Sequence, residues 1–181
     1  MQSLRYALVA YVKSEAGEFA ERLQRELYPQ SPHLAAHLTI LPPRLLPSSE
    51  AAALALVEQI CIQSAPFDVT LGGVETFLPT TPTVYLRVAQ AAARMSELHS
   101  HLNIAALAFH EEWPYVPHLT IAKLDSESAA RAAAEIARLR WASYPGSRVI
   151  HVDRLTFVRE DSPNCWVDLA PVLLGPTLVS R

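Results

Sequence analysis

The sequence is poor in features that cross-link a chain or carry it into a membrane. Only two of its 181 residues are cysteines, and Cys61 and Cys165 lack the C-x-x-C spacing of zinc and redox motifs. Both have apolar neighbours, which predicts reduced core residues in a reducing compartment. The apolar run from Tyr6 to Val12 is short and has neither a basic leader nor a small-residue cleavage site. No apolar run is long enough to span a bilayer, so we expect a cytoplasmic protein that does not associate with membranes.

The sequence also lacks an excess of positive charge. Its formal net charge at pH 7 is -3, so there is no global positive field to hold long nucleic acid non-specifically. The end of an RNA or a single nucleotide needs only a local cluster of donors and stays open as a ligand. Half of the residues are apolar, which is enough for a sizeable core.

The tetrapeptide HLTI occurs twice, at residues 37–40 and at residues 118–121. Each copy follows an apolar segment, and its Thr and Ile are residues that favour strands. The period-two geometry of a strand puts the His and Thr of each copy on one face and the Leu and Ile on the other. Each copy therefore offers an imidazole and a hydroxyl side by side, on a strand whose other face is anchored in a core.

Helical and strand patterns alternate along the whole chain. Helices are predicted from Ser14 to Leu27, from Ser48 or Ser49 to Ile62, from Ala91 to Ala105, and from Ser126 or Ser128 to about Arg140. Strands are predicted at 4–12, 37–40, 67–71, 74–77, 84–88, 118–121, 149–152, 155–158 and 166–169. Pro42-Pro43 is expected to end the first HLTI strand, and Gly72-Gly73 to form a bulge or tight turn.

The two HLTI copies lie 81 positions apart, and this offset extends beyond them. It pairs Val69 with Ile150, Leu71 with Val152, Val74 with Leu155 and Tyr85 with Trp166. A period this long with two copies indicates a duplicated lobe. We expect an α+β protein with pseudo-two-fold symmetry, in which two antiparallel sheets with outer helices form a central groove. Residues 1–181 would make one bilobal domain, with lobes of about 1–88 and 89–181 and chain segments free to cross between them.

Two His-x-Thr pairs facing one groove could act on a phosphodiester. One imidazole, of His37 or His118, would take a proton from the nucleophile while the other gives a proton to the leaving oxygen. The hydroxyls of Thr39 and Thr120 could donate to the non-bridging phosphate oxygens. This chemistry requires no metal and no other cofactor.

Two other enzyme classes fit the sequence less well. A zinc site needs further ligands, and no carboxylate, His or Cys stands at a ligand-like spacing beside either HLTI copy. A serine hydrolase of the nucleophile-elbow type needs a G-x-S-x-G motif, which the sequence lacks. The other five histidines have no partner at the 81-residue offset and are predicted to be surface or core residues.

Three residues near the two copies are candidates for substrate binding. Lys123 could contact phosphate, although strict alternation puts it on the opposite face to Thr120 unless the strand twists or ends. Arg44 is a second candidate for a phosphate contact. Tyr115, with Trp113 beside it, could stack on a base or pack between the lobes.

The motifs resemble those of the 2H phosphoesterase superfamily, and most closely those of bacterial 2'-5' RNA ligases, also called RNA 2',3'-cyclic phosphodiesterases. Residues 36–40 resemble the first motif of this family, and residues 117–123 resemble the second motif with its following basic residue. Residues 67–77 are similar to the stretch between them, whereas Pro42-Pro43-Arg44 differs from the Phe and Gly of many RNA-ligating members. The resemblance implies a bilobal fold and metal-independent chemistry at His37, Thr39, His118 and Thr120.

The expected partner is therefore an RNA 3' end or a small nucleotide that carries a cyclic phosphate, and no feature indicates a protein partner. The expected activity is hydrolysis of a 2',3'-cyclic phosphate or a related cyclic phosphodiester, with reversible 2'-5' RNA ligation as a possible further reaction of the same site. The alternative is a non-catalytic module whose groove binds an RNA end or a phosphate ligand without turnover.

Overall fold

The computed structural model describes residues 4–175, which form four helices, one short 3-10 turn and eight strands. The helices are α1 (Glu15–Leu27), α2 (Glu50–Cys61), α3 (Ala92–Leu102) and α4 (Glu127–Ala142), with the 3-10 turn η1 at Ala105–Leu107. The strands are β1 (Arg5–Tyr11), β2 (His37–Arg44), β3 (Phe67–Thr76), β4 (Thr83–Gln90), β5 (His118–Lys123), β6 (Val149–Val152), β7 (Arg154–Ser162) and β8 (Cys165–Leu173).

All eight strands belong to one antiparallel sheet, in the order β6-β3-β4-β5-β2-β1-β7-β8. The α+β class and the antiparallel pairing are as predicted, but the expectation of two separate sheets is wrong. The two four-stranded halves are joined between β2 and β5 through the pairing of Leu38 with Leu119. These residues are related by the 81-residue offset, so the pseudo-two-fold relation is centred on this pair.

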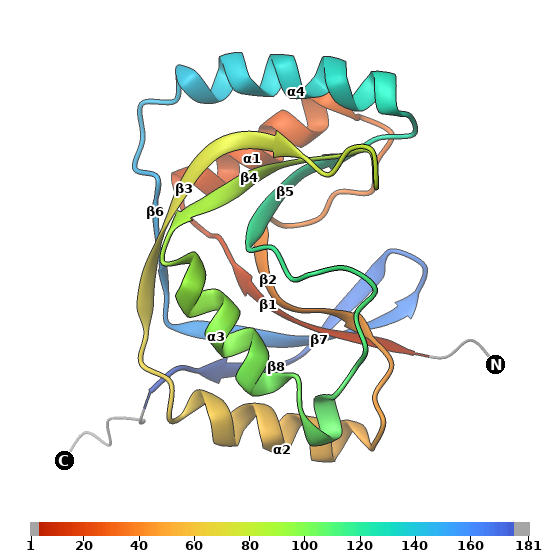
Figure 1. The fold of residues 1–181 in the computed structure, drawn as a ribbon, viewed down its shortest axis with the longest axis vertical. Helices are drawn as coiled ribbons and strands as arrows, with labels where there is room; N and C mark the ends of the chain where they lie inside the picture. The colour runs from red at the N-terminus through yellow and green to blue at the C-terminus, as the bar shows by residue number, and fades with distance from the viewer. Residues whose placement is uncertain (1–3, 176–181) are drawn as a thin grey trace.

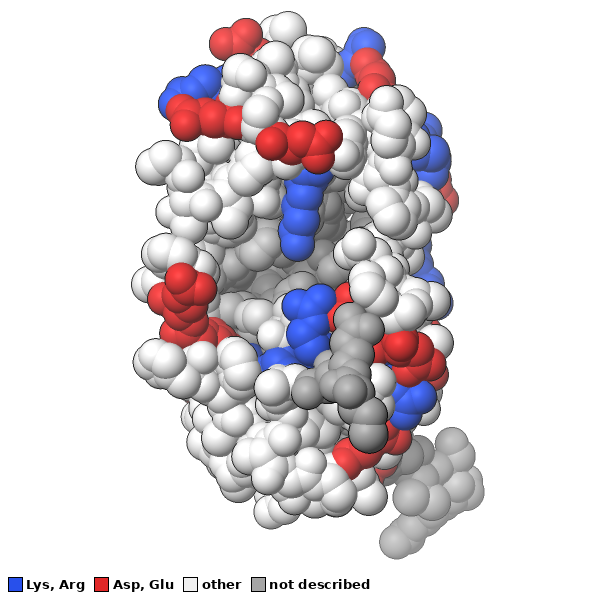
Figure 2. Space-filling view, turned by 90° about the vertical axis from the view of Figure 1, so that its right-hand side faces the viewer, with Lys and Arg blue, Asp and Glu red and all other residues white. Residues whose placement is uncertain are grey.

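Each half of the sheet takes strands from both halves of the sequence. β3 and β4 pair with β5 and β6, whereas β1 and β2 lie beside β7 and β8. In Figure 1 the first half lies above the second, and β2 and β5 meet between them. Figure 2 shows the molecule from the right-hand side of Figure 1. This side is hollowed, and basic side chains lie at the hollow.

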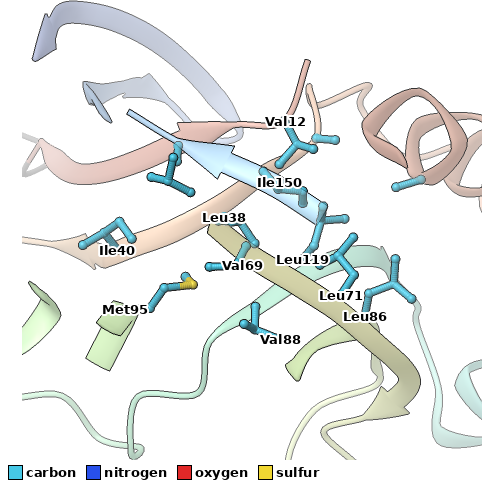
Figure 3. Packing of buried hydrophobic residues seen from close by; sticks show 14 of the residues in the cluster. Val12, Leu38, Ile40, Val69, Leu71, Leu86, Val88, Met95, Leu119 and Ile150 are labelled. Atoms are coloured by element: carbon cyan, nitrogen blue, oxygen red, sulfur yellow. The ribbon is translucent and has the colours of Figure 1, made fainter. Parts of the chain in front are cut away.

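The helices pack against the two halves of the sheet, with α1 and α4 in the upper half of Figure 1 and α2 and α3 in the lower half. α1 contacts β5 and α4 contacts β3, while α3 contacts β2 and α2 contacts β8. The resulting core is continuous across the junction of the halves, as the packing of Leu38 and Leu119 among Val69, Leu71 and Leu86 illustrates (Figure 3). Helix starts agree with the predicted caps, because Ser49 accepts a hydrogen bond from the Ala52 amide and Ser126 from the Ala129 amide, both at 3.2 Å.

Bulges interrupt the regular pairing at several points. Gly72-Gly73 forms the predicted bulge, because the register passes from Leu71 opposite Val88 to Val74 opposite Leu86. The prediction that Pro42-Pro43 ends β2 is wrong, since the strand continues to Arg44. Both prolines lie within a register shift between Leu41 and Arg44, where a residue without an N–H is tolerated.

The two cysteines differ in environment. Both are free, and Cys61 is buried as predicted. Cys165 is exposed, so its assignment to the core is wrong. It lies at the turn between β7 and β8, opposite Ser162.

The junction of the halves can be tested through stability. Leu38→Ala removes a fully buried side chain (0% exposed) at the centre of the core and should lower the free energy of unfolding by about 3 kcal/mol in urea denaturation. Leu139→Ala on α4 is the matched control, because Leu139 is 74% exposed and its truncation should change stability by less than about 0.5 kcal/mol. Equal losses in the two variants would contradict this view of the junction.

Candidate functional site

The two HLTI copies lie side by side at the junction of β2 and β5. Because the pairing is antiparallel and Leu38 lies opposite Leu119, continuing the register places His37 opposite Thr120 and Thr39 opposite His118. The two histidines are then diagonal neighbours, separated by about 7–8 Å between backbones. The predicted meeting of the two His-x-Thr pairs is therefore observed on adjacent strands of one sheet face, instead of on two sheets across a groove.

The outer strands identify which face this is. Cross-strand partners point to the same face of a sheet. On one side Thr39 lies opposite Val9, and His37 opposite Tyr11. On the other side Thr120 lies opposite Tyr85 and His118 opposite Arg87. We call this the site face. The other face of β1, β2, β4 and β5 carries the core residues.

Matching backbone contacts hold the two imidazoles. The Nδ1–H of His37 donates to the carbonyl oxygen of Ala35 (2.7 Å), and the Nδ1–H of His118 donates to that of Val116 (2.6 Å). The two carbonyls are also 81 residues apart. Since a carbonyl oxygen only accepts, each contact places the proton on Nδ1 and leaves Nε2 with a free lone pair in the neutral ring.

Both histidines are held towards their neutral form. Burial lowers the pKa of His37 below its ordinary value of 6.5, and the positive charge of Lys123 lowers it further, while the contact with Ala35 opposes the shift. The pKa of His118 is lowered in the same way, with burial as the largest cause and with additional contributions from Lys123 and His37. The three groups therefore interact electrostatically with one another.

Lys123 reaches the site face through a bulge. The pairing of β4 and β5 passes from Tyr85 opposite Thr120 to Val84 opposite Ala122, so Ile121 is an extra residue in β5. Ile121 and Ala122 are both buried, the alternation shifts by one, and exposed Lys123 lies on the same face as Thr120. Lys123 could contact a phosphate beside Thr120 only if the strand departed from strict alternation, and this bulge is such a departure.

The same bulge occurs in the other half of the sheet. The pairing of β1 and β2 passes from Val9 opposite Thr39 to Leu8 opposite Leu41, which makes Ile40 the extra residue. Pro42 then stands where β5 has Lys123. The two motifs therefore share backbone geometry but differ in charge, and the cation comes from β5.

Arg44 does not lie at the site, which corrects its assignment as a phosphate contact. The second register shift in β2 brings it opposite Tyr6, a core residue, and its side chain is only 1% exposed. Its guanidinium donates to Asn103 Oδ1 (2.7 Å) and to the carbonyl of Leu107 (3.0 Å), and it forms an ion pair with Glu111. All of these partners come from the segment that leads into β5.

Tyr115 links the two strands instead of offering a free ring. Its hydroxyl donates to the carbonyl oxygen of Thr39 (2.7 Å), and its ring stacks on the imidazole of His99 with centroids 4.0 Å apart. The side chain is partly buried against the core, which agrees with packing between the halves. Trp113, two residues earlier, is exposed.

Several side chains beside the histidines could not be recognised from the sequence. The ring of His118 contacts Phe77 and Tyr85 at centroid distances of 4.9 and 5.1 Å. Tyr11 lies edge-on to His37 at 6.5 Å and donates to Asp168 (2.5 Å). The register of β1 and β4 against the HLTI strands would have located Tyr11 and Tyr85, but a single sequence does not supply that register.

The described residues contain no cluster of side chains that could hold a metal ion and no helix that could span a membrane. Within residues 4–175 no group of three or more His, Cys, Asp and Glu side chains is arranged to hold a metal ion. None of the helices in this range has the length and apolarity that crossing a bilayer demands.

Matched His-x-Thr strands at the centre of a duplicated α+β sheet define the 2H phosphoesterase class. The family model described as the 2'-5' RNA ligase superfamily matches residues 12–164, and the chain belongs to this family.

Curated proteins and solved structures agree with this membership. A protein of Halalkalibacterium halodurans, whose name assigns it provisionally to the phosphoesterases, is 21% identical over 95% of this chain and 98% of its own length. A similarly named protein of Oceanobacillus iheyensis is 25% identical over 66% of this chain and 71% of its own. LigT of Escherichia coli, solved with 3'-AMP, has the same fold with a TM-score of 0.65 and 18% identity, covering 96% of this chain and 99% of LigT.

The electrostatic coupling in the site gives a prediction that does not depend on activity. Replacing Lys123 by Met removes a positive charge that disfavours protonation of both rings, so the pKa values of His37 and His118 should both rise in an NMR titration. Arg131→Met on the exposed face of α4, where Arg131 pairs with Glu127, is the control and should move neither value. A shift confined to one histidine, or none, would contradict the placement of Lys123.

Proposed function

We propose that this chain is a metal-independent phosphoesterase that hydrolyses 2',3'-cyclic phosphates, or related cyclic phosphodiesters, on RNA 3' ends or small nucleotides. If the 5'-hydroxyl of a second RNA, instead of water, attacks the cyclic phosphate and the 3' oxygen leaves, the product is a 2'-5' linkage, so the same site would also support reversible 2'-5' RNA ligation. The observation that carries the proposal is the pair of imidazoles on one sheet face, each with its Nδ1–H bound to a carbonyl and its Nε2 free.

The reaction needs one proton acceptor and one proton donor on opposite sides of the phosphorus. One neutral imidazole, of His37 or His118, takes a proton from water through Nε2 as the water oxygen attacks phosphorus. The other imidazole, protonated on Nε2, gives its proton to the ribose oxygen as the cyclic P–O bond breaks. The product is a phosphomonoester, and the two rings end with their protonation states exchanged.

In the proposed reaction, Thr39, Thr120 and Lys123 stabilise the charge that develops on the phosphate. The hydroxyls donate to non-bridging oxygens, and their position beside the opposite histidine keeps both donors next to the reacting centre. The ammonium of Lys123 adds a positive charge near both rings. Because Pro42 occupies the matching position in the first motif, the phosphate is held more strongly on the β5 side.

A lowered pKa favours the histidine that acts as base and disfavours the one that acts as acid. In the free protein, burial and Lys123 keep both rings towards the neutral form. A bound phosphodiester brings a negative charge that offsets Lys123 and raises the pKa of a neighbouring imidazole. Substrate binding would therefore help to supply the proton that the leaving oxygen needs.

Relatives of the same fold support a nucleotide ligand. Structures of Escherichia coli LigT hold 3'-AMP in one case and phosphate in another. A nucleoside monophosphate is the kind of product that opening a 2',3'-cyclic phosphate gives. The alternative is a non-catalytic module that binds such a group without turnover, and it would show binding of 3'-AMP with no hydrolysis of the cyclic nucleotide.

The roles of the histidines can be tested by substitution. His37→Ala and His118→Ala should each lower kcat on a nucleoside 2',3'-cyclic phosphate by about a hundred- to ten-thousand-fold, because each removes one proton transfer. His151→Ala is the control, since His151 pairs with Asp68 on the exposed edge at β3 and β6, and its activity should equal that of the unmodified protein. Full activity in either site variant would refute the proposal.

The pH dependence follows from the direction of the pKa shifts. One ring must be neutral and the other protonated, and the pKa values of both are lowered from 6.5 in the free protein. The profile of kcat/KM should therefore be a bell with its maximum below pH 6.5, and Lys123→Met should move the bell to higher pH.

EDTA should leave the rate unchanged, whereas loss of activity with EDTA would favour a metal-dependent reaction.

A further inference from the structure

A network of polar side chains lies behind the site, and the proposed reaction does not use it. Glu111 forms an ion pair with Arg44 through one carboxylate oxygen, and its other oxygen lies 3.3 Å from His99 Nε2. The ring of His99 stacks on Tyr115 with an interplanar angle of 1°. Arg44 and His99 are buried, and Glu111 is largely so.

At one end of this network, His99 and Tyr115 bind the backbone of β2 at its bulge. The Nδ1–H of His99 donates to the carbonyl of Ile40 (2.8 Å), and the hydroxyl of Tyr115 donates to the carbonyl of Thr39 (2.7 Å). Ile40 is the extra residue of the bulge, so both contacts hold backbone groups two and three residues after His37.

The other end leads into the second motif. Tyr115 precedes Val116, whose carbonyl accepts the Nδ1–H of His118 (2.6 Å). A shift of Tyr115 would move this carbonyl and with it the ring of His118. The polar network therefore contacts the backbone of β2, which carries His37, and the segment whose Val116 carbonyl orients His118.

The energetic cost of this arrangement points to a role other than stability. Removing a guanidinium and a carboxylate from water costs several kcal/mol per ion, and apolar residues in place of such a pair are often neutral or stabilising. Arg44 also has its other donors matched, to Pro42 O (3.0 Å), Asn103 Oδ1 and Leu107 O. A fully satisfied buried network fixes one geometry, which a packed apolar cluster would define less sharply.

In the other half of the duplicated fold, an exposed hydrogen bond makes the equivalent link between a pre-motif segment and the opposite strand. The position that matches Arg44 is Asp125, just beyond β5. Its carboxylate accepts hydrogen bonds from the hydroxyl of Tyr28 (2.8 Å), which lies in the segment leading to the first motif. In both halves the segment before one histidine is tied to the end of the other strand, and on the Arg44 side this tie is buried.

We propose that His99, Glu111 and Tyr115 are positioning residues that lock the segment before β5 against β2 and so fix the placement of the His118 imidazole relative to His37. Their effect on turnover rests on the proposed function, whereas their effect on the ring of His118 does not. A misplacement of about 1 Å in such a site costs on the order of a hundredfold in rate.

The test compares Tyr115→Phe with Tyr28→Phe. Each substitution removes one hydroxyl that ties a pre-motif segment to the other half of the sheet. Tyr115→Phe should lower kcat on a nucleoside 2',3'-cyclic phosphate by about ten- to a hundredfold with KM within about twofold, while Tyr28→Phe stays within about twofold in both. His99→Phe, which keeps a ring for stacking but loses the contacts with Ile40 and Glu111, should act in the same direction as Tyr115→Phe.

Imidazole NMR supplies a readout that does not need turnover. The contact with Val116 raises the pKa of His118, so loosening it in Tyr115→Phe should lower the pKa of His118 and mix its tautomers. Unchanged kcat and unchanged His118 signals in Tyr115→Phe, or an equal loss in Tyr28→Phe, would overturn the positioning role. If the unmodified protein does not turn over the cyclic nucleotide, the proposed function fails, and the NMR comparison alone decides the positioning role.

Discussion

The pairing of Leu38 with Leu119 is the constraint on which the rest of this structure depends. It is the seam between two four-stranded halves, and both side chains are fully buried in one core. Because the strands are antiparallel and the pair lies on the pseudo-two-fold axis, the register sets each histidine beside the threonine of the other motif. A slip of one residue in either strand would turn the His and the Thr of that strand away from the site face.

Duplication repeated the backbone of the site but not its charge. A bulge at Ile40 and another at Ile121 give both strands the same change of face after the His-x-Thr pair. The residue that each bulge then presents differs, with Pro42 on one side and Lys123 on the other. One cation lies near both imidazoles, so a symmetric scaffold carries an asymmetric field. Such asymmetry suits a reaction whose two proton transfers run in opposite directions.

The second difference between the halves lies beneath the site. The segment before β5 is held by buried groups around Arg44 and Glu111. The segment before β2 is tied to the other half by the exposed contact of Tyr28 with Asp125, and Glu21 of α1 accepts a hydrogen bond from the Ala36 amide. The same position in the repeat, Arg44 or Asp125, has thus become the anchor of a buried network in one half and a surface acceptor in the other. The fold tolerates this because the duplicated sheet, not these side chains, supplies most of the core.

The sequence by itself determined the class of fold, the four residues of the site face and the correspondence between the two motifs. Period two decides which residues of HLTI share a face, and the constant offset relates the two copies, since both are local or one-dimensional properties. Tertiary structure alone decided that the two predicted sheets are one, that Lys123 joins the site and that Arg44 leaves it. These outcomes depend on register shifts against β1 and β4 and on residues 99–115 closing over β2. A bulge exists only relative to a partner strand, so no pattern within β2 or β5 could reveal it.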